Sequence, residues 1–192
     1  WSDEDLMMEY RTYGDRGAFE TLVRRYESEL YNYLRHYLGN AEMAEDAFQA
    51  TFLQVHLKCE QFDPDRRVRP WLYTVATNQA IDAQRRNRRH RMVSLDRRVG
   101  CDGAEETGVL RDLVDSEGPS PFDQIESAEE RHEVRSAVDR LPDSLREVLL
   151  LVYYQGLKYR EAADVLDIPV GTVKSRLHAA IRKLDQVLTH AR

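Results

Sequence analysis

The sequence predicts an all-α protein with two small helical domains joined by a flexible linker, and three observations lead to this expectation. Apolar residues recur at steps of three and four along most of the chain, without a convincing run that alternates apolar and polar residues. Glycine, proline or asparagine stands where one helical segment would end and the next begin. The periodicity fails between the two halves, so we expect domains at 1–90 and 127–192 and a linker at 91–126.

The first domain is expected to contain four helices, each bounded by local stop or cap signals. Ser2 is a favoured N-cap, Gly39-Asn40 combines a helix stop with a new cap, and the Asp63-Pro64-Asp65 cluster breaks a helix. Pro70 suits a first helical turn. The expected helices cover about 3–13, 19–38, 41–60 and a segment that starts at Pro70 and dissolves into an arginine-rich stretch.

The second domain is expected to be a compact helical bundle that ends in a helix-turn-helix. Periodicity returns near Ile125, Pro142 opens a further helix, and Gly156 stops it. Residues 158–184 then read as helix, tight turn and helix, with the small Ala162 and Ala163 allowing close packing and Pro169 ending the first helix. We expect five side chains of the second helix to face the core: Val173, Leu177, Ala180, Ile181 and Leu184.

The opposite face of that second helix is short, polar and partly basic, as a recognition helix in the major groove requires. Ser175 and His178 could reach base edges, whereas lysine and arginine side chains could hold phosphates. A helical hairpin whose charged face merely meets water is the alternative. The residues assigned to DNA on this helix are Thr172, Lys174, Ser175, Arg176, His178 and Arg182.

Charge is segregated along the 192-residue chain, whose formal net charge is −6. Residues 85–98 contain seven arginines and one aspartate, whereas residues 102–133 contain eleven acidic residues and two arginines. An acidic protein with one basic block is poorly suited to coating DNA alone, but it can contact phosphates when a partner holds it in place. We therefore expect a carrier partner.

A second candidate DNA surface combines cations and aromatic rings around the start of the fourth helix. Single-stranded nucleic acid is often bound by such rings together with a basic track along its backbone. The alternative is that Trp71 and Tyr73 belong to the core and the arginines to a solvated face. The residues assigned to this surface are Arg66, Arg67, Arg69, Trp71, Tyr73, Asn78, Asp82, Arg85, Arg86 and Arg88.

Composition and spacing argue against several other classes of protein. Cys59 and Cys101 do not form a disulfide framework, and His56 with Cys59 lacks a second pair of ligands at metal spacing. A glycine-rich phosphate loop and a catalytic constellation are both missing, so we expect neither an enzyme nor a cofactor. Without an apolar span or a secretory signal, we expect a cytoplasmic protein without membrane insertion.

Three motifs follow one another along the chain. They are Ala44-Glu45-Asp46-Ala47-Phe48-Gln49-Ala50-Thr51-Phe52-Leu53-Gln54-Val55, then Trp71-Leu72-Tyr73-Thr74-Val75-Ala76-Thr77-Asn78 with Asp82 and Arg85-Arg86, and finally Leu141-Pro142 through Gly171-Thr172-Val173-Lys174-Ser175-Arg176-Leu177. Together they resemble the bacterial sigma-70 superfamily, and specifically its extracytoplasmic-function (group IV) branch. The likeness covers nearly the whole chain except the linker.

The resemblance implies an RNA polymerase sigma factor that binds core polymerase and directs initiation at promoters with −10 and −35 elements. The implied partners are core RNA polymerase, through its β′ clamp coiled coil and β flap, promoter DNA and an anti-sigma factor. The helix with Asp46, Gln49, Phe52 and Val55 matches the segment that docks on the clamp. The surface around the fourth helix matches the −10 reader, and the helix-turn-helix matches the −35 reader.

Two further points stay open at this stage. The acidic linker, which the resemblance places toward the polymerase active centre and RNA exit path, is either a mimic of nucleic acid or a solvated tether. The alternative function is a stand-alone helix-turn-helix regulator, which would bind duplex DNA tightly without polymerase and usually as a dimer.

Overall fold

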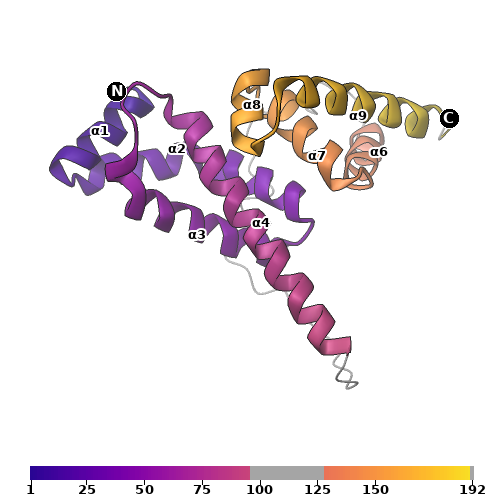
Figure 1. Ribbon diagram of the computed structural model, residues 1–192, viewed down its shortest axis with the longest axis horizontal. Helices are drawn as coiled ribbons and strands as arrows, with labels where there is room; N and C mark the ends of the chain where they lie inside the picture. The colour runs from indigo at the N-terminus through magenta and orange to yellow at the C-terminus, as the bar shows by residue number, and fades with distance from the viewer. Residues whose placement is uncertain (96–127, 191–192) are drawn as a thin grey trace. The chain divides into compact units, whose positions relative to one another are not determined.

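The computed structural model describes residues 1–95 and 128–190, and within these ranges the ordered elements are helices without any strand (Figure 1). They form two compact units: the first contains α1 to α3 and α4 from Val75 onward, and the second contains α6 to α9 together with the segment Arg67–Thr74. The predicted all-α class with two helical domains is confirmed. Residues 96–127, which include most of the predicted linker and Cys101, lie outside the described residues.

The first unit begins with α1 (Asp3–Tyr13), α2 (Arg16–Leu38) and α3 (Ala41–Lys58), followed by the short 3₁₀ helix η1 (Cys59–Gln61). The predicted caps are confirmed. The Ser2 hydroxyl accepts a hydrogen bond from the Asp5 backbone N–H at 3.1 Å, and the Asn40 side chain accepts one from the Met43 N–H at 2.9 Å. Gly39 ends α2 in a left-handed conformation with φ of 68°, which a residue with a side chain rarely adopts.

The core of the first unit lies where α2 packs against α1 and α3. Leu22, Leu30 and Leu34 of α2 are almost completely buried, and burial of each such side chain contributes roughly 1.5–3 kcal/mol. The hydroxyl groups of Tyr33 on α2 and Thr77 on α4 form a buried hydrogen bond of 2.8 Å. This bond fixes α4 against α2 without leaving the two hydroxyls unsatisfied in the core.

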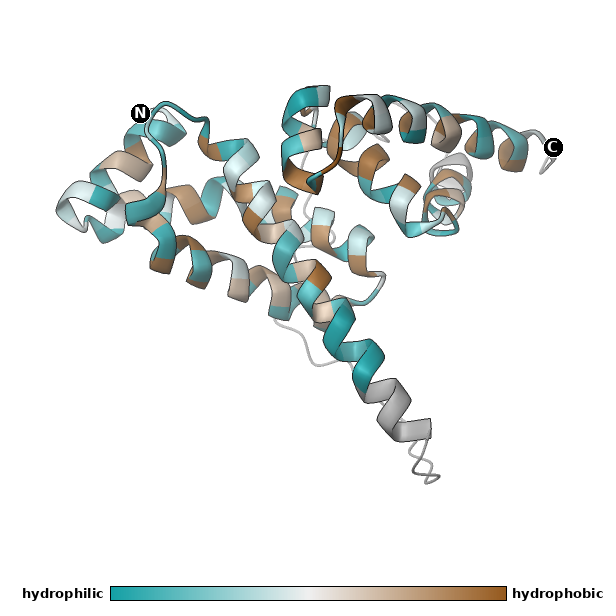
Figure 2. Cartoon of the chain, viewed as in Figure 1, coloured by the Kyte–Doolittle hydropathy of each residue, from teal (hydrophilic) through white to brown (hydrophobic). Residues whose placement is uncertain are grey.

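Helix α4 (Val68–Leu95) differs from the prediction at both of its ends. It begins two residues before Pro70, which therefore occupies the first turn, where its missing N–H costs no helical hydrogen bond. It also continues to Leu95 through the arginine-rich stretch instead of dissolving there, because arginine is a good helix former. Figure 2 shows a strongly hydrophilic stretch within the second half of α4. The domain boundaries at 90 and 127 stay a prediction.

The second unit contains α6 (Ala128–Asp139), α7 (Asp143–Leu149), the π-helical turn η3 (Leu150–Tyr154), α8 (Tyr159–Leu166) and α9 (Val170–His190). Helix α9 packs against α6, α7 and α8. The core consists of aliphatic and alanine side chains such as Val148, Leu151 and Ala162. The predicted stop at Gly156 is confirmed by its left-handed φ of 64°.

Candidate nucleic-acid and partner interfaces

The helix-turn-helix of the second unit is built from α8, a tight turn and α9. Ala162 and Ala163 are buried, which allows the two helices to pack closely. Asp167 turns the chain with a left-handed φ of 52°, and the Ile168 N–H donates to the Ala163 carbonyl at 3.1 Å. Pro169 then begins the next helix by accepting a hydrogen bond from the Thr172 N–H at 2.9 Å. The predicted helix-turn-helix is therefore confirmed.

The buried and the exposed residues of α9 lie on two different faces of the helix. Val173, Leu177 and Ala180 are buried, as predicted, because they recur at steps of three and four residues. Ile181, which was also expected to face the core, is 48% exposed, and Leu184 is half-buried. Ile181 lies 100° around the helix from the buried Ala180, at the edge of the face that packs against α6, α7 and α8.

Four of the six α9 residues assigned to DNA are exposed together on the outer face: Lys174, Ser175, His178 and Arg182. The Lys174 ammonium lies 5.9 Å from the ring centre of Tyr159, at the start of α8. The Ser175 hydroxyl donates to the Thr172 carbonyl at 3.1 Å, which leaves its oxygen able to accept a further hydrogen bond. This face thus offers cations beside short polar side chains.

The remaining two assigned residues of α9 lie closer to the protein interior. Thr172 is half-buried, and the Arg176 guanidinium is directed toward α7, where its Nη1 lies 3.9 Å from Glu147 Oε1. Arg176 therefore faces a carboxylate of its own domain rather than the outer surface with Lys174. Its assignment to a DNA phosphate stays a prediction.

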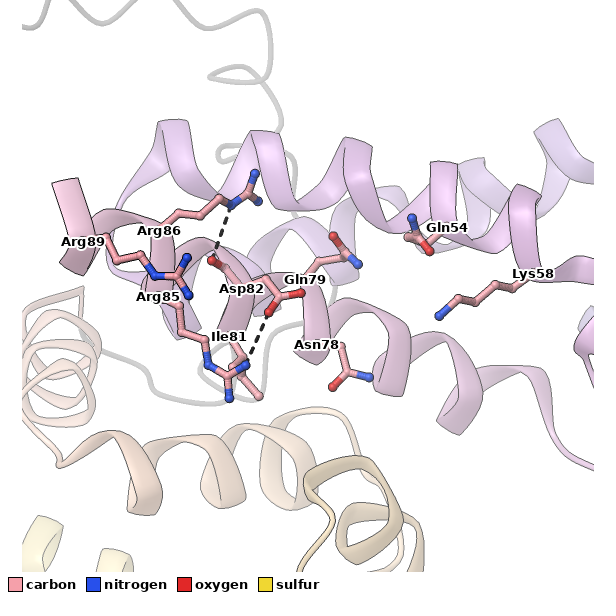
Figure 3. A pocket seen from close by; sticks show the side chains of 9 residues that line it. All are labelled: Gln54, Lys58, Asn78, Gln79, Ile81, Asp82, Arg85, Arg86 and Arg89. Atoms are coloured by element: carbon pink, nitrogen blue, oxygen red, sulfur yellow. Dashed lines mark hydrogen bonds and ion pairs between the residues drawn. The ribbon is translucent and has the colours of Figure 1, made fainter.

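A polar groove of about 750 Å³ lies in the first unit between α3 and α4. Figure 3 shows its side chains reaching toward one another from the two helices. The Arg85 Nη1 lies 3.7 Å from the Asp82 Oδ1 across one helical turn. The lining residues are Gln54 and Lys58 of α3 with Asn78, Gln79, Ile81, Asp82, Arg85, Arg86 and Arg89 of α4.

The structure brings four of the residues assigned to the −10 element into this groove: Asn78, Asp82, Arg85 and Arg86. Asn78 is exposed, and the buried polar side chain of this part of α4 is its neighbour Thr77. The exposed surface of Asn78 is therefore available to a ligand.

The other residues assigned to the −10 element do not line the groove. Arg66 and Arg67 are exposed, and Arg66 Nε lies 3.7 Å from Asp63 Oδ2. Arg88 is exposed on α4, whereas Arg69 and Trp71 are half-buried. Tyr73 is completely buried, as the alternative interpretation of this ring expected.

Helix α3 presents an exposed face that matches only part of the predicted polymerase-binding set. Asp46 and Gln49 are exposed, as expected. Phe52 is only 7% exposed and Val55 is completely buried, so neither presents a free surface in this chain, and their assignment to the polymerase stays a prediction. Successive steps of three residues rotate by about 60° away from the starting direction, so Val55 points about 180° from Asp46.

Two leucines occupy the outward positions that the prediction gave to Phe52 and Val55. Leu53 is 57% exposed and Leu57 is 60% exposed. They lie four residues apart and therefore on one face of α3, and they extend the surface begun by Asp46 and Gln49. This surface, defined by Asp46, Gln49, Leu53 and Leu57, is called the α3 outer face below.

Sequence reasoning missed both leucines of the α3 outer face and five lining residues of the groove. The five are Gln54, Lys58, Gln79, Ile81 and Arg89. A signal was present for the pair on α3, because Gln54 and Lys58 are one helical turn apart. That α4 forms the opposite wall depends on tertiary packing, which no local pattern of the sequence indicates.

Ionisation and metal binding give these surfaces no further chemistry. Among the described residues, no cluster of three or more histidine, cysteine or acidic side chains could hold a metal ion. The resolved pKa shifts lie elsewhere: burial raises the pKa of Tyr154, Tyr31 and Tyr10, and hydrogen bonds from Ser2 lower that of Asp5. In the described part of the chain, no helix is both long and apolar enough to cross a membrane.

Comparison with protein families assigns both units. Residues 22–90 match the model of Sigma-70 region 2, and residues 131–184 match that of Sigma-70, region 4. The ECF RNA polymerase sigma factor SigW of Bacillus subtilis is 35% identical over 173 residues, which cover 88% of this chain and 90% of SigW. The RNA polymerase sigma-H factor of Pseudomonas aeruginosa is 30% identical over 183 residues, which cover 91% and 88% of the two chains.

Solved structures agree with this assignment. The structure of CnrH in complex with the cytosolic domain of CnrY has a TM-score of 0.69 and 25% identity, and the match covers 99% of each chain. The sigma factor RpoE of Bartonella quintana, solved with the anti-sigma factor NepR, has a TM-score of 0.68 and 21% identity over 91% of this chain and 98% of RpoE, and shares the fold. The chain belongs to the extracytoplasmic-function family of RNA polymerase sigma factors.

Proposed function

We propose that this sigma factor binds core RNA polymerase through the α3 outer face and reads promoter DNA with two separate surfaces. The groove between α3 and α4 would bind the −10 element, and the outer face of α9 would bind the −35 element. The observation that carries the proposal is the division of α9 into a buried apolar face and an exposed face of Lys174, Ser175, His178 and Arg182. That division is what a recognition helix in the major groove requires.

The α3 outer face supports a protein partner. Two exposed leucines beside a carboxylate and an amide form a small apolar centre with a polar edge, which is the usual anatomy of a protein interface. We propose that the partner is the β′ clamp coiled coil, and that the second domain contacts the β flap. CnrH is bound to another protein in its solved structure, so we also propose an anti-sigma factor as a partner.

The groove supports contact with DNA strands that have separated. Asn78 and Arg86 are both exposed on α4, and both line the groove together with other polar side chains. Amide contacts and phosphate contacts in such a groove would stabilise unpaired nucleotides and offset the free energy of unpairing. As a subunit that works with RNA polymerase, the protein would act in the cytoplasm. It would catalyse no reaction of its own.

Reconstituted transcription tests this function directly. Core polymerase with the wild-type chain should initiate at defined start sites on duplex promoters, whereas the chain alone should bind duplex DNA weakly because its net charge is −6. Asn78→Ala combined with Arg86→Ala should reduce open complexes more on duplex templates than on templates with a pre-opened −10 bubble. Arg24→Ala, an exposed change on α2, serves as the control.

Two results would contradict the proposal. Tight, sequence-specific binding of duplex DNA by the isolated chain would favour a stand-alone regulator. Equal defects of the Asn78/Arg86 double variant on duplex and pre-opened templates would place these residues in folding or polymerase docking instead of strand separation.

A further inference from the structure

The groove of the first unit has a second wall, which is formed by Gln54 and Lys58 of α3. The two residues lie one helical turn apart on the same face of α3. Gln54 is half-buried, whereas Lys58 is exposed at the end of the helix. Their side chains extend toward the same space as Asn78 and Gln79 of α4 (Figure 3). The groove is therefore a two-walled site and not only a row of arginines along α4.

Charge in this groove is concentrated at its two ends. Lys58 stands at one end, and Arg85, Arg86 and Arg89 stand toward the other (Figure 3). The single carboxylate of the lining, Asp82, already faces Arg85 at 3.7 Å. Four cations against one carboxylate favour an anionic ligand, and their separation favours an extended ligand with charges at intervals, as in a phosphodiester backbone.

Amide side chains occupy the part of the groove between these two groups of cations. Gln54, Asn78 and Gln79 each offer both a hydrogen-bond donor and an acceptor, which is the pairing capacity that a base edge requires. A duplex keeps its base edges within its grooves, so the half-buried amides of Gln54 and Gln79 can reach a base only after the strands separate. The lining therefore fits a single strand better than a duplex.

We propose that Gln54 and Lys58 hold the unpaired −10 strand from the α3 side, with Lys58 binding a phosphate and Gln54 contacting a base edge. This inference rests on the proposed function of the groove, and it adds a specificity-determining residue and a phosphate anchor outside α4. Because one residue corresponds to a rotation of 100°, Lys58 points about 100° from Leu57 and about 140° from Leu53, whereas Gln54 borders the α3 outer face at about 60° from Leu57. Substitutions of Lys58 and of the two leucines can therefore separate binding of DNA from binding of polymerase.

The phosphate contact is tested in the holoenzyme with a promoter fragment whose −10 region is pre-opened. Lys58→Glu should weaken binding of this template about tenfold, and Lys58→Ala should make the salt dependence shallower by about 0.7 in the log–log slope, the value for one phosphate contact on a single strand. Lys58→Arg should retain binding. Arg24→Glu on α2 is the matched charge reversal, and it should bind like the wild type.

The base contact is tested with a library of pre-opened templates in which the −10 positions are randomised. Gln54→Ala should relax the preference at one position and leave the salt slope unchanged, whereas Lys58→Ala should weaken all sequences alike. Affinity for core polymerase and helicity should remain those of the wild type for every variant.

Three outcomes would overturn the inference in distinguishable ways. If Lys58→Glu binds the template like the wild type while Asn78→Ala binds it more weakly, the α3 wall does not contact DNA. The proposed function of the groove would then still stand. Loss of core polymerase affinity equal to the loss of template binding would show that Lys58 contacts protein. Wild-type behaviour of both Lys58→Glu and Asn78→Ala would reject the groove as a DNA site, and with it the proposed −10 function.

Discussion

Helices α3 and α9 both carry residues assigned to a partner, but the two sets differ in how many of their side chains are buried. On α9, Lys174, Ser175 and His178 are exposed, and the adjacent Val173 and Leu177 are buried. On α3, half of the assigned set is buried in the core of the first unit. The difference follows from how the residues were spaced, because the exposed α9 positions 174, 175, 178 and 182 advance by one, three and four residues and so stay on one side of the helix.

The α3 positions instead advance by three residues at every step. Such a series rotates around the helix, and it passes from the exposed Asp46 to the buried Val55 within three steps. A motif that runs along a helix therefore mixes residues that bind a partner with residues that hold the fold. Burial separates the two groups, and it shifts the expected contact of α3 to Leu53 and Leu57.

The largest expected effect is the loss of stability caused by truncating a buried side chain of α3. Phe52→Ala should lower the free energy of unfolding by roughly 3–5 kcal/mol, because the ring is buried at centroid distances of 5.1 Å from Phe48 and 6.3 Å from Phe19. Leu53→Ala, one residue further on, should change it by about 0.5 kcal/mol or less. Urea unfolding of the two variants measures the difference, and similar losses would show that α3 is not divided in this way.

The next largest effect concerns DNA binding by the outer face of α9. In a randomised −35 library, Ser175→Ala or His178→Ala should cost about 1–3 kcal/mol at one base position, whereas Lys174→Ala should weaken all sequences and lower the salt slope by about one. Arg176→Ala should lower the salt slope less than Lys174→Ala does, because the Arg176 guanidinium faces Glu147 in the free chain. If Arg176→Ala lowers the slope as Lys174→Ala does, Arg176 turns outward on binding DNA.

Local signals were sufficient to predict most of the fold. Ser2, Asn40 and Gly39 act on the backbone within one turn of the chain, so their capping roles were readable without knowledge of the tertiary structure. The extension of α4 through the arginines was missed, because a charge block was interpreted as an end of helical order rather than as a run of good helix formers.

The candidate sites were less predictable than the fold, because they depend on contacts between distant segments. Gln54 and Lys58 gain a partner wall only when α3 and α4 come together. Arginine commonly binds phosphate, but the guanidinium of Arg176 is directed toward a carboxylate of α7. Neither of these contacts between distant segments can be recognised from the periodicity of the sequence.

The smallest effect concerns α1, which carries no residue assigned to a partner. Hydrogen bonds from the backbone N–H and the hydroxyl of Ser2 lower the pKa of Asp5. Because the folded pKa lies below the unfolded value, this stabilisation is present above the unfolded pKa and is lost as pH falls through the folded pKa. Asp5→Asn should therefore reduce stability slightly near neutral pH and not in acid, as measured by urea unfolding at several pH values. A loss of equal size in acid would contradict the assignment to the ionised carboxylate.

The most direct measurement is the affinity of the α3 outer face for core RNA polymerase. The double variant Leu53→Ser/Leu57→Ser should bind core polymerase at least about tenfold more weakly, with unchanged helicity and unfolding midpoint, because both side chains are exposed in the free protein. Ile181→Ser, which removes a similarly exposed apolar side chain from α9, should bind like the wild type. Wild-type affinity of the double variant would contradict the account, as would an equal loss in Ile181→Ser.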